Sequence, residues 1–356
     1  MKKYNFYSGP AILPQEVFEE ASKAVLKLGN IEMSLIEISH RSKDFVNVME
    51  EAKQHVKDLL QLDNDQQVLF MQGGASMQFC MIPYNLLNEG DTAAYLETGV
   101  WAKKAIKEAK FFGNVNVVAS SAGKNFNFIP KNYVVPNDSK YFHITTNNTI
   151  YGSQLHEMPV APVPLVADMS SDIFSKPVEG RKYDFIYAGA QKNMGTSGVT
   201  LVVVRESLLG KVKRPIPTIL DYRTHIKEGS LFNTPCTFAI YVSMLTLRWI
   251  KKMGGLSAMQ KINEVKAKVL YDEIDRNPLF DGVIAKEDRS LMNVTFTINK
   301  PEHEEAFANA AKDAGCIGIK GHRSVGGFRA SIYNAMPLEG VQVLVDVMKE
   351  FTVKNG

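Results

Sequence analysis

The chain has 356 residues and a formal net charge of +3, with 45% hydrophobic and 22% charged residues, as expected for a globular protein of about two domains. So small a net charge gives no case for binding nucleic acid or a membrane surface, and no apolar stretch reaches the ~20 residues that span a bilayer. Three scattered cysteines without metal spacing, and an N-terminus without a signal-peptide pattern, predict a cytoplasmic protein with free thiols and no metal site.

The first two thirds of the chain alternate between strand and helix patterns. Residues 8–14 form a loop, a helix is expected to begin near Pro14, and residues 42–62 predict a long amphipathic helix. Apolar runs predict strands at 68–71, 93–96, 115–118, 141–145, 165–168, 185–188 and 200–204, with helices from about Ala75 and over 101–110. This order predicts an α/β fold in which a mostly parallel sheet is covered by helices on both faces. Ligands of such sheets bind at the carboxyl ends of the strands.

The last hundred residues differ in character. The glycine pair at 254–255 is expected to end a long helix. Helices are then predicted at 257–276, 302–314 and 338–351, with a strand at 293–298 and a strand pair at 316–319 and 328–332. We therefore expect a large domain over 16–255 and a smaller α+β domain over 256–356, with residues 1–15 packing against the smaller one.

Lys192 and Asp168 are the strongest candidates for catalysis. Each follows a short apolar run that predicts a buried strand, so each charge must be costly to desolvate and needs a reason to be there. A desolvated, neutral lysine amine condenses with an aldehyde to form a Schiff base, and pyridoxal phosphate is the common aldehyde. An aspartate at the end of the second, upstream strand could pair with the pyridinium nitrogen of that cofactor and keep it protonated.

Other polar segments also follow predicted strands, and each has a structural alternative. Gln72-Gly73-Gly74-Ala75-Ser76 could bind an anion at a helix N-terminus or form a tight turn. Trp101 could stack on a flat ring or fill the core, and Thr149 could bond a ring oxygen. Asn233 and Thr234 could offer polar groups to a phosphate or cap a helix. No G-x-G-x-x-G or Walker pattern is present, which disfavours a dinucleotide site.

Basic residues occur in two loop pairs, His40-Arg41 and His322-Arg323, and Arg329 lies within a predicted strand. Arginine offers a planar fork to a carboxylate or phosphate, and histidine adds a further donor. Both pairs could be solvated surface charges. This alternative is weaker for Arg329, because burying an unpaired guanidinium is expensive.

Taken together, these segments resemble the pyridoxal-phosphate enzymes of the aspartate-aminotransferase fold, and most closely the phosphoserine aminotransferase family. The similar segments occur in order over nearly the whole chain, at residues 5–11, 39–42, 70–79, 168–171, 187–193, 233–235, 321–323 and 326–331. Single segments are weak evidence, but so many in order form a specific signal. Some members carry Gly-Arg where this chain has Ala75-Ser76, so its site is expected to be less basic there.

The resemblance assigns a role to each candidate. Lys192 would bind the cofactor aldehyde and move protons, Asp168 would pair with the pyridinium nitrogen, and Trp101 would stack on the ring. Ala75, Ser76 and Gln191 would contact the cofactor phosphate, Thr149 would lie near the ring oxygen, and Asn233 and Thr234 would reach the phosphate from a second subunit, implying a homodimer. Ser8, Arg41 and Arg329 would contact the amino-acid substrate, while His40, Arg41, His322 and Arg323 would hold its phosphate or distal carboxylate.

The implied reaction transfers the amino group of L-glutamate to 3-phosphohydroxypyruvate by a ping-pong mechanism, giving O-phospho-L-serine and 2-oxoglutarate in serine biosynthesis. Whether the related substrate 4-phosphohydroxythreonine of vitamin B6 synthesis is also used stays open. Two rivals are a cysteine desulfurase or serine–glyoxylate transaminase of the same fold, and a phosphometabolite-binding protein without catalysis. A desulfurase needs an exposed nucleophilic cysteine, for which Cys236 is the only candidate.

Overall fold

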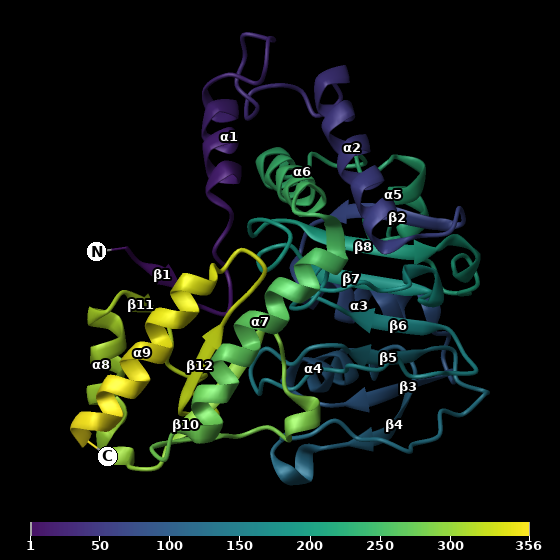
Figure 1. Cartoon of the computed structure of the whole chain (residues 1–356). Coiled ribbons are helices and arrows are strands. Elements are labelled where there is room, and N and C mark those ends of the chain that lie inside the picture. Colours follow the sequence, from purple (N-terminus) through teal and green to yellow (C-terminus); the bar gives the residue numbers. More distant parts are fainter. Residues whose placement is uncertain (1, 356) are drawn as a thin grey trace.

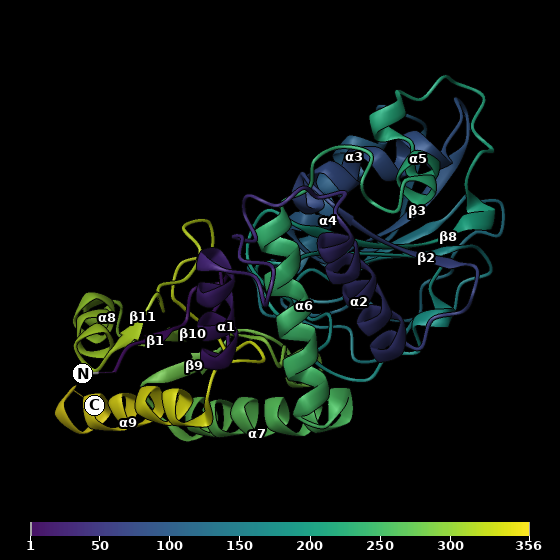
Figure 2. The same cartoon turned by 90° about the horizontal axis from the view of Figure 1, so that it is seen from above.

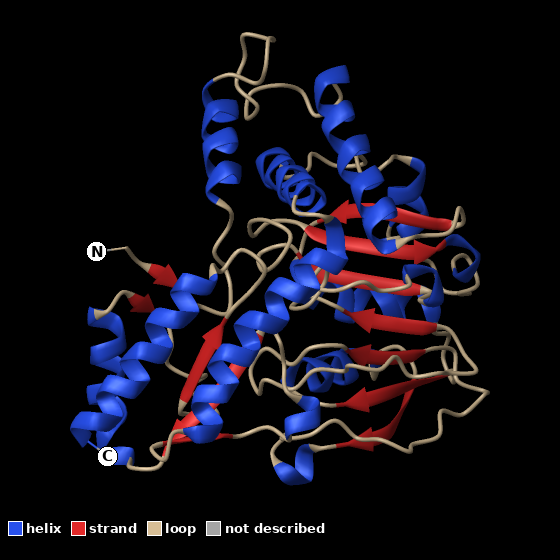
Figure 3. Cartoon of the chain, viewed as in Figure 1, coloured by secondary structure: helices blue, strands red, loops and turns tan. Residues whose placement is uncertain are grey.

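A seven-stranded sheet forms the centre of the larger part of the molecule in the computed structural model, which describes residues 2–355 (Figures 1 and 3). In spatial order the strands are β2 (Gln66–Met71), β8 (Thr200–Arg205), β7 (Phe185–Gly189), β6 (Leu165–Asp168), β5 (Phe142–Thr145), β3 (Thr92–Glu97) and β4 (Asn114–Ser120). Only β8 runs antiparallel to its neighbours, and the other pairs are parallel. The predicted mostly parallel sheet is therefore confirmed.

Helices cover both faces of this sheet, as Figure 2 shows. On one face lie α3 (Gly74–Leu86), α4 (Val100–Ala109) and α5 (Tyr222–Lys227); on the other lie α2 (Lys43–Leu60) and α6 (Thr237–Lys252), with α1 (Gln15–Leu26) packed against α6. The alternation of side chains along a strand explains the two layers. Val68 and Phe70 join the core beneath α2 and α6, whereas Leu69 and Met71 join the core beneath α3.

The α2 helix illustrates how closely apolar periodicity follows burial. All seven apolar residues that repeat at helical spacing over 42–62 are buried: Phe45, Val48, Met49, Ala52, Val56, Leu59 and Leu60. The Ser42 hydroxyl accepts a hydrogen bond from the Phe45 amide and caps the helix at its N-terminus. Within residues 2–355, no helix combines the length and the apolar character needed to cross a membrane.

A second core lies beside the large sheet (Figure 1). Its elements are β1 (Tyr4–Asn5), α7 (Gly255–Arg276), β9 (Phe280–Gly282), β10 (Asn293–Ile298), α8 (Glu304–Asp313), β11 (Cys316–Ile317), β12 (Phe328–Ser331) and α9 (Leu338–Asn355). Strand β10 pairs antiparallel with β12 and β9, and β1 pairs in parallel with β11. We propose that the two cores mark two domains over 16–255 and 256–356. The burial of Tyr4 and Phe6 in the second core supports placing residues 1–15 against it.

One pairing prediction is wrong. The segments at 316–319 and 328–332 do not form a strand pair, because β11 bonds to the N-terminal strand β1 and β12 bonds to β10. A single bridge between Lys320 and Phe328 joins the two segments. Short 3-10 helices complete the described chain at Ala122–Lys124, Gly180–Lys182, Glu206–Leu208, Thr218–Leu220, Lys286–Asp288 and Pro301–His303.

Candidate active site

A cavity of about 650 Å³ lies between the carboxyl edge of the large sheet and the second core. Eleven of the fifteen candidate residues line it: Ser8, Ala75, Ser76, Trp101, Thr149, Asp168, Gln191, Lys192, His322, Arg323 and Arg329. Most lie at or just after the carboxyl ends of β2, β3, β5, β6 and β7, in a loop or in the first turn of the next helix, and these strand ends meet at one edge because those strands run in the same direction. The others come from the segment after β1, from strand β12 and from the loop before it.

Lys192 lies three residues beyond β7, and its residue is only 8% exposed. Its amine donates a hydrogen bond to the Thr149 hydroxyl at 2.8 Å and forms no ion pair within residues 2–355. Burial lowers the pKa of the Lys192 amine to about 8, opposed by the nearby Asp168 carboxylate and reinforced by the Arg329 guanidinium. A larger fraction of the Lys192 amine is therefore neutral and nucleophilic at neutral pH than for a lysine in water.

Asp168 ends β6, the strand next to β7 in the sheet. Burial raises the pKa of its carboxyl group, while bonds from Ser170 and the charge of Lys192 lower it. The Ser170 amide donates to Oδ1 at 2.9 Å. The Tyr187 hydroxyl also acts on this carboxylate and lies 2.8 Å from Nε2 of His143. A buried carboxylate without a bound cation of its own favours a positively charged partner such as a pyridinium.

The turn between β2 and α3 is built for close approach to an anion. Gly73 and Gly74 have φ values of +89° and +64°, a region that residues with a Cβ rarely adopt. A Cβ on Gly73 would also lie 2.6 Å from that of Met77. The first amides of α3, including those of Ala75 and Ser76, have no partner one turn earlier in the helix and line the cavity. The helix N-terminus thus presents free donors and partial positive charge to the cavity.

Trp101 lies in the first turn of α4 and lines the cavity. Its indole Nε1 is buried without a hydrogen-bond partner. The amine of Lys104, one turn further along α4, lies 4.6 Å from the centroid of the Trp101 ring. This distance is typical of a cation–π contact.

Arg329 projects from the second core into the same cavity. Its two terminal nitrogens donate to the Thr149 carbonyl oxygen at 3.2 Å and to the Ser8 hydroxyl at 2.9 Å, and its Nε has no partner. No carboxylate pairs with it within residues 2–355, and burial lowers the pKa of the guanidinium. The Tyr333 hydroxyl donates to the Ser8 carbonyl at 2.7 Å and fixes the Ser8 segment. An unpaired, buried guanidinium at a cavity wall is a site for an anionic ligand.

His322 and Arg323 lie in the loop between β11 and β12. Nδ1 of His322 lies 2.7 Å from the Ser324 hydroxyl. Burial lowers the pKa of this imidazole, and the charges of Arg329, Arg323 and Lys104 lower it further. The charges of all three cations thus act on one imidazole ring.

Four candidate residues do not line the cavity of their own chain: His40, Arg41, Asn233 and Thr234. The Asn233 amide donates to the Gln72 side chain at 3.0 Å, and Gln72 donates to the Thr234 carbonyl at 3.3 Å. Asn233 and Thr234 therefore lie near the turn between β2 and α3 but outside the cavity.

Several lining residues were absent from the sequence prediction, including Thr145, Asn147, Ser171 and Lys104. For Lys104 a signal existed, because it follows Trp101 by one helical turn and must share a face of α4 with it. Ala75-Ser76 in place of Gly-Arg predicts a less basic site, and Lys104 adds a positive charge to the cavity that this prediction does not include.

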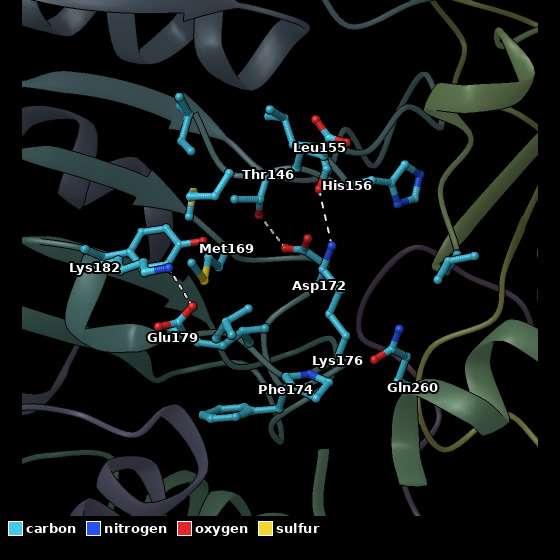
Figure 4. A pocket seen from close by; sticks show the side chains of 18 of the residues that line it. Thr146, Leu155, His156, Met169, Asp172, Phe174, Lys176, Glu179, Lys182 and Gln260 are labelled. Carbon is cyan, nitrogen blue, oxygen red and sulfur yellow. Dashed lines mark hydrogen bonds and ion pairs between the residues drawn. The ribbon is translucent and has the colours of Figure 1, made fainter. Parts of the chain in front are cut away.

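A second cavity of about 570 Å³ is lined by residues that include Asp172 and Thr146 (Figure 4). Figure 4 shows the Thr146 hydroxyl directed at the Asp172 carboxylate and the Lys176 side chain reaching toward the carbonyl of Leu155. None of the fifteen candidate residues lines this cavity.

The three cysteines also lie outside the first cavity. Burial raises the pKa of the Cys80 thiol, and raises that of Cys316 to about 12. Cys236 receives a hydrogen bond from Gln72 at 3.5 Å. No cysteine thus stands where a desulfurase would need a nucleophile.

Comparison with known proteins places this geometry in a family. The family described as aminotransferase class-V matches residues 3–344. A phosphoserine aminotransferase of Flavobacterium johnsoniae is 59% identical over 99% of this chain and 100% of that protein. The solved phosphoserine aminotransferase from Bacillus circulans subsp. alkalophilus has a TM-score of 0.97 at 45% identity, covering 100% of this chain and 99% of that one.

A pyridoxal-phosphate-bound phosphoserine aminotransferase from Trichomonas vaginalis is also similar, with a TM-score of 0.93 at 40% identity over 98% of this chain and 100% of that one. Both the sequence and the structural matches extend over nearly the full length of this chain and of its relatives. The chain therefore belongs to the aminotransferase class-V family and, within it, to the phosphoserine aminotransferases.

Proposed function

We propose that this protein transfers the amino group of L-glutamate to 3-phosphohydroxypyruvate, giving O-phospho-L-serine and 2-oxoglutarate. The observation that carries the proposal is the shared cavity of Lys192, a buried amine with a pKa of about 8, and Asp168, a buried carboxylate on the adjacent strand. The names of the relatives supply the substrate class. A protein that only binds phosphometabolites would need neither group.

The residues present fit pyridoxal phosphate. A buried amine suits its aldehyde, a buried carboxylate suits its ring nitrogen, and the amides at the start of α3 suit its phosphate. Trp101 offers an aromatic face at the same cavity wall. Gln191 and Thr149 are proposed to contribute the remaining polar contacts. When bound, the cofactor supplies an aldehyde carbon and a ring that stabilises negative charge at the substrate α-carbon.

The chain's own side chains have separate roles in the reaction. Lys192 Nζ takes the proton from the substrate α-carbon and keeps it until it is donated back to carbon. This role suits an amine whose pKa lies near neutral pH. Asp168 holds the ring nitrogen protonated. Arg329 binds the α-carboxylate that both amino-acid substrates carry, because its guanidinium is buried and lacks a carboxylate partner. Ser8 orients that guanidinium through the 2.9 Å contact with its hydroxyl.

One pocket must also accept a phosphate ester and, in the other half-reaction, a carboxylate. His322 and Arg323 suit this requirement, since they line the cavity from a loop and form no ion pair within residues 2–355. Cationic side chains on a loop, such as that of Arg323, can adjust to an anion whose position differs between the two substrates.

The purified protein is expected to be yellow and to convert 3-phosphohydroxypyruvate to O-phospho-L-serine only when L-glutamate is present. Borohydride should fix the cofactor to Lys192, because it reduces the carbon–nitrogen bond between them, and peptide mass mapping would locate the label. A colourless protein that borohydride leaves unlabelled and inactive would reject the proposal. Sulfide release from L-cysteine would instead favour the desulfurase.

We further propose a homodimer with shared sites. Asn233 and Thr234 lie outside the cavity of their own chain although the resemblance gives them a role in cofactor binding, so that role requires a second copy. His40 and Arg41 also lie outside it, and the same argument extends to them. The three free cysteines and the biosynthetic reaction support a cytoplasmic location.

Mixing two defective chains tests the shared site. One chain carries Lys192→Ala, and the other carries Asn233→Ala with Thr234→Ala; the two are co-expressed and assayed at limiting cofactor. If Asn233 and Thr234 act across a symmetric interface, mixed dimers contain one intact site, and about one quarter of the wild-type sites should be recovered. If the pair acts within its own chain, mixing restores nothing, and the proposed sharing is wrong.

A further inference from the structure

Lys104 is a cation of the cavity wall to which no role has been assigned so far. It lies on α4 one turn after Trp101, its side chain lines the cavity, and its amine lies 4.6 Å from the Trp101 ring centroid. Its residue is exposed, so its flexible stem lies at the rim of the cavity and not on its floor.

The charges around Lys104 favour an anion. Within residues 2–355 it forms neither an ion pair nor a side-chain hydrogen bond with another residue of the chain. The residues that line the cavity include Arg323 and Arg329 as further cations, and Asp168 as the sole carboxylate. Lys104 lines the same cavity as His322 and Arg323, and its charge helps to lower the pKa of His322. Like charges held together repel one another, and a bound anion relieves that repulsion.

The geometry also says which anion Lys104 meets. The α-carboxylate is proposed to lie at Arg329, which reaches the cavity between Ser8 and Thr149. The cofactor phosphate is proposed to lie at the N-terminus of α3, on another element. Lys104 approaches the Trp101 ring and lines the same cavity as His322 and Arg323, so the distal group of the substrate is the anion left for it.

We propose that Lys104 binds the distal phosphate of the substrate together with His322 and Arg323, and thereby favours phosphorylated substrates over glutamate. A phosphate monoester carries close to two negative charges at neutral pH, whereas the distal carboxylate of glutamate carries one. Removing one rim cation therefore weakens the phosphorylated substrate more. This inference rests on the proposed function, since it concerns the substrate of that same site.

The test compares Lys104→Met, Lys104→Arg and the matched control Lys103→Met in the cofactor-loaded enzyme. Lys103 is the adjacent exposed lysine on α4, but it does not line the cavity. For Lys104→Met, kcat/KM for O-phospho-L-serine should fall about fivefold at low salt, the upper range for an exposed ion pair, and kcat/KM for L-glutamate less than about twofold. Lys104→Arg should restore the phosphoserine value, and Lys103→Met should match the wild type. The difference between the substrates should shrink as ionic strength rises.

Other outcomes overturn the assignment. Equal losses for both substrates would mean that Lys104 supports the site without reading the phosphate, and no loss for either would mean that its charge has no role. A fall in the cofactor absorbance per chain would place Lys104 at the cofactor. If Lys103→Met behaves like Lys104→Met, the effect is one of overall charge. A wild-type enzyme inactive on O-phospho-L-serine would instead refute the proposed function, so the two failures are distinguishable.

Discussion

Lys192→Ala is expected to lower kcat for both half-reactions by about 10⁴-fold, the upper range of what a positioned general base contributes. The expected loss is large because the alanine removes both the nucleophile for the cofactor aldehyde and the base at the substrate α-carbon. The measurement is single-turnover absorbance after mixing with L-glutamate or with O-phospho-L-serine. Adding methylamine, a small amine that can enter the space left by the side chain, should restore part of the proton-transfer rate.

A second buried lysine provides the control. Lys266 is fully buried, burial lowers the pKa of its amine to about 7, and it donates to the carbonyl oxygens of Ile332, Tyr333 and Asn334 outside the cavity. Lys266→Met should lower the thermal midpoint, because it leaves buried carbonyls without a donor, yet it should still give a borohydride-stable cofactor adduct. Normal turnover by Lys192→Ala without added amine would contradict the assignment of the catalytic base.

Arg329→Ala is expected to reduce kcat/KM for L-glutamate and for O-phospho-L-serine alike, by about 10²- to 10³-fold, equivalent to about 3–4 kcal/mol. Both amino acids carry the α-carboxylate, and removing one partner of a buried charge pair leaves the other unpaired. Steady-state kinetics in both directions would measure the losses. This pattern differs from that of Lys104, whose loss should fall on one substrate.

Arg329→Lys separates charge from shape. Lysine keeps the positive charge but not the planar fork, so it should recover only part of the loss. Arg289→Ala is the matched control, since Arg289 is also largely buried and also has an unpartnered Nε, but it pairs with Asp275 outside the cavity. That variant should change stability and leave the ratio of the two kcat/KM values unchanged. If Arg329→Ala affects only one substrate, Arg329 does not bind the shared α-carboxylate.

Local sequence patterns predicted the mostly parallel sheet and placed Asp168 and Lys192 at the ends of strands, for a physical reason. Asp168 and Lys192 each follow a short apolar run, and the carboxyl ends of neighbouring parallel strands must lie side by side. The strand assignment placed both residues at strand ends, and the pairing of β6 with β7 brings them together. The apolar face of α2 follows from helical periodicity in the same way.

Features that depend on long-range packing were harder to predict. Nothing in the residues around Cys316 indicates that β11 pairs with the N-terminal strand and not with β12, because both partners offer the same backbone groups. Lys104 was missed because its role depends on how α4 is rotated against the cavity, which packing decides. Of the four residues outside the cavity, Asn233 and Thr234 were expected from a second subunit only through the resemblance, and His40 and Arg41 were not, since one sequence does not say which copy supplies a side chain.

The contact between Ser8 and Arg329 joins positions 321 residues apart in the chain. A ribosome must therefore release residue 329 before the guanidinium can dock on the N-terminal segment that holds Ser8. Until then, the cavity lacks the wall that is proposed to hold an amino acid by its carboxylate. A cofactor bound at Lys192 before that point would lack the group proposed to position the amino-acid substrate, so selectivity for amino acids would arise only after Arg329 has docked.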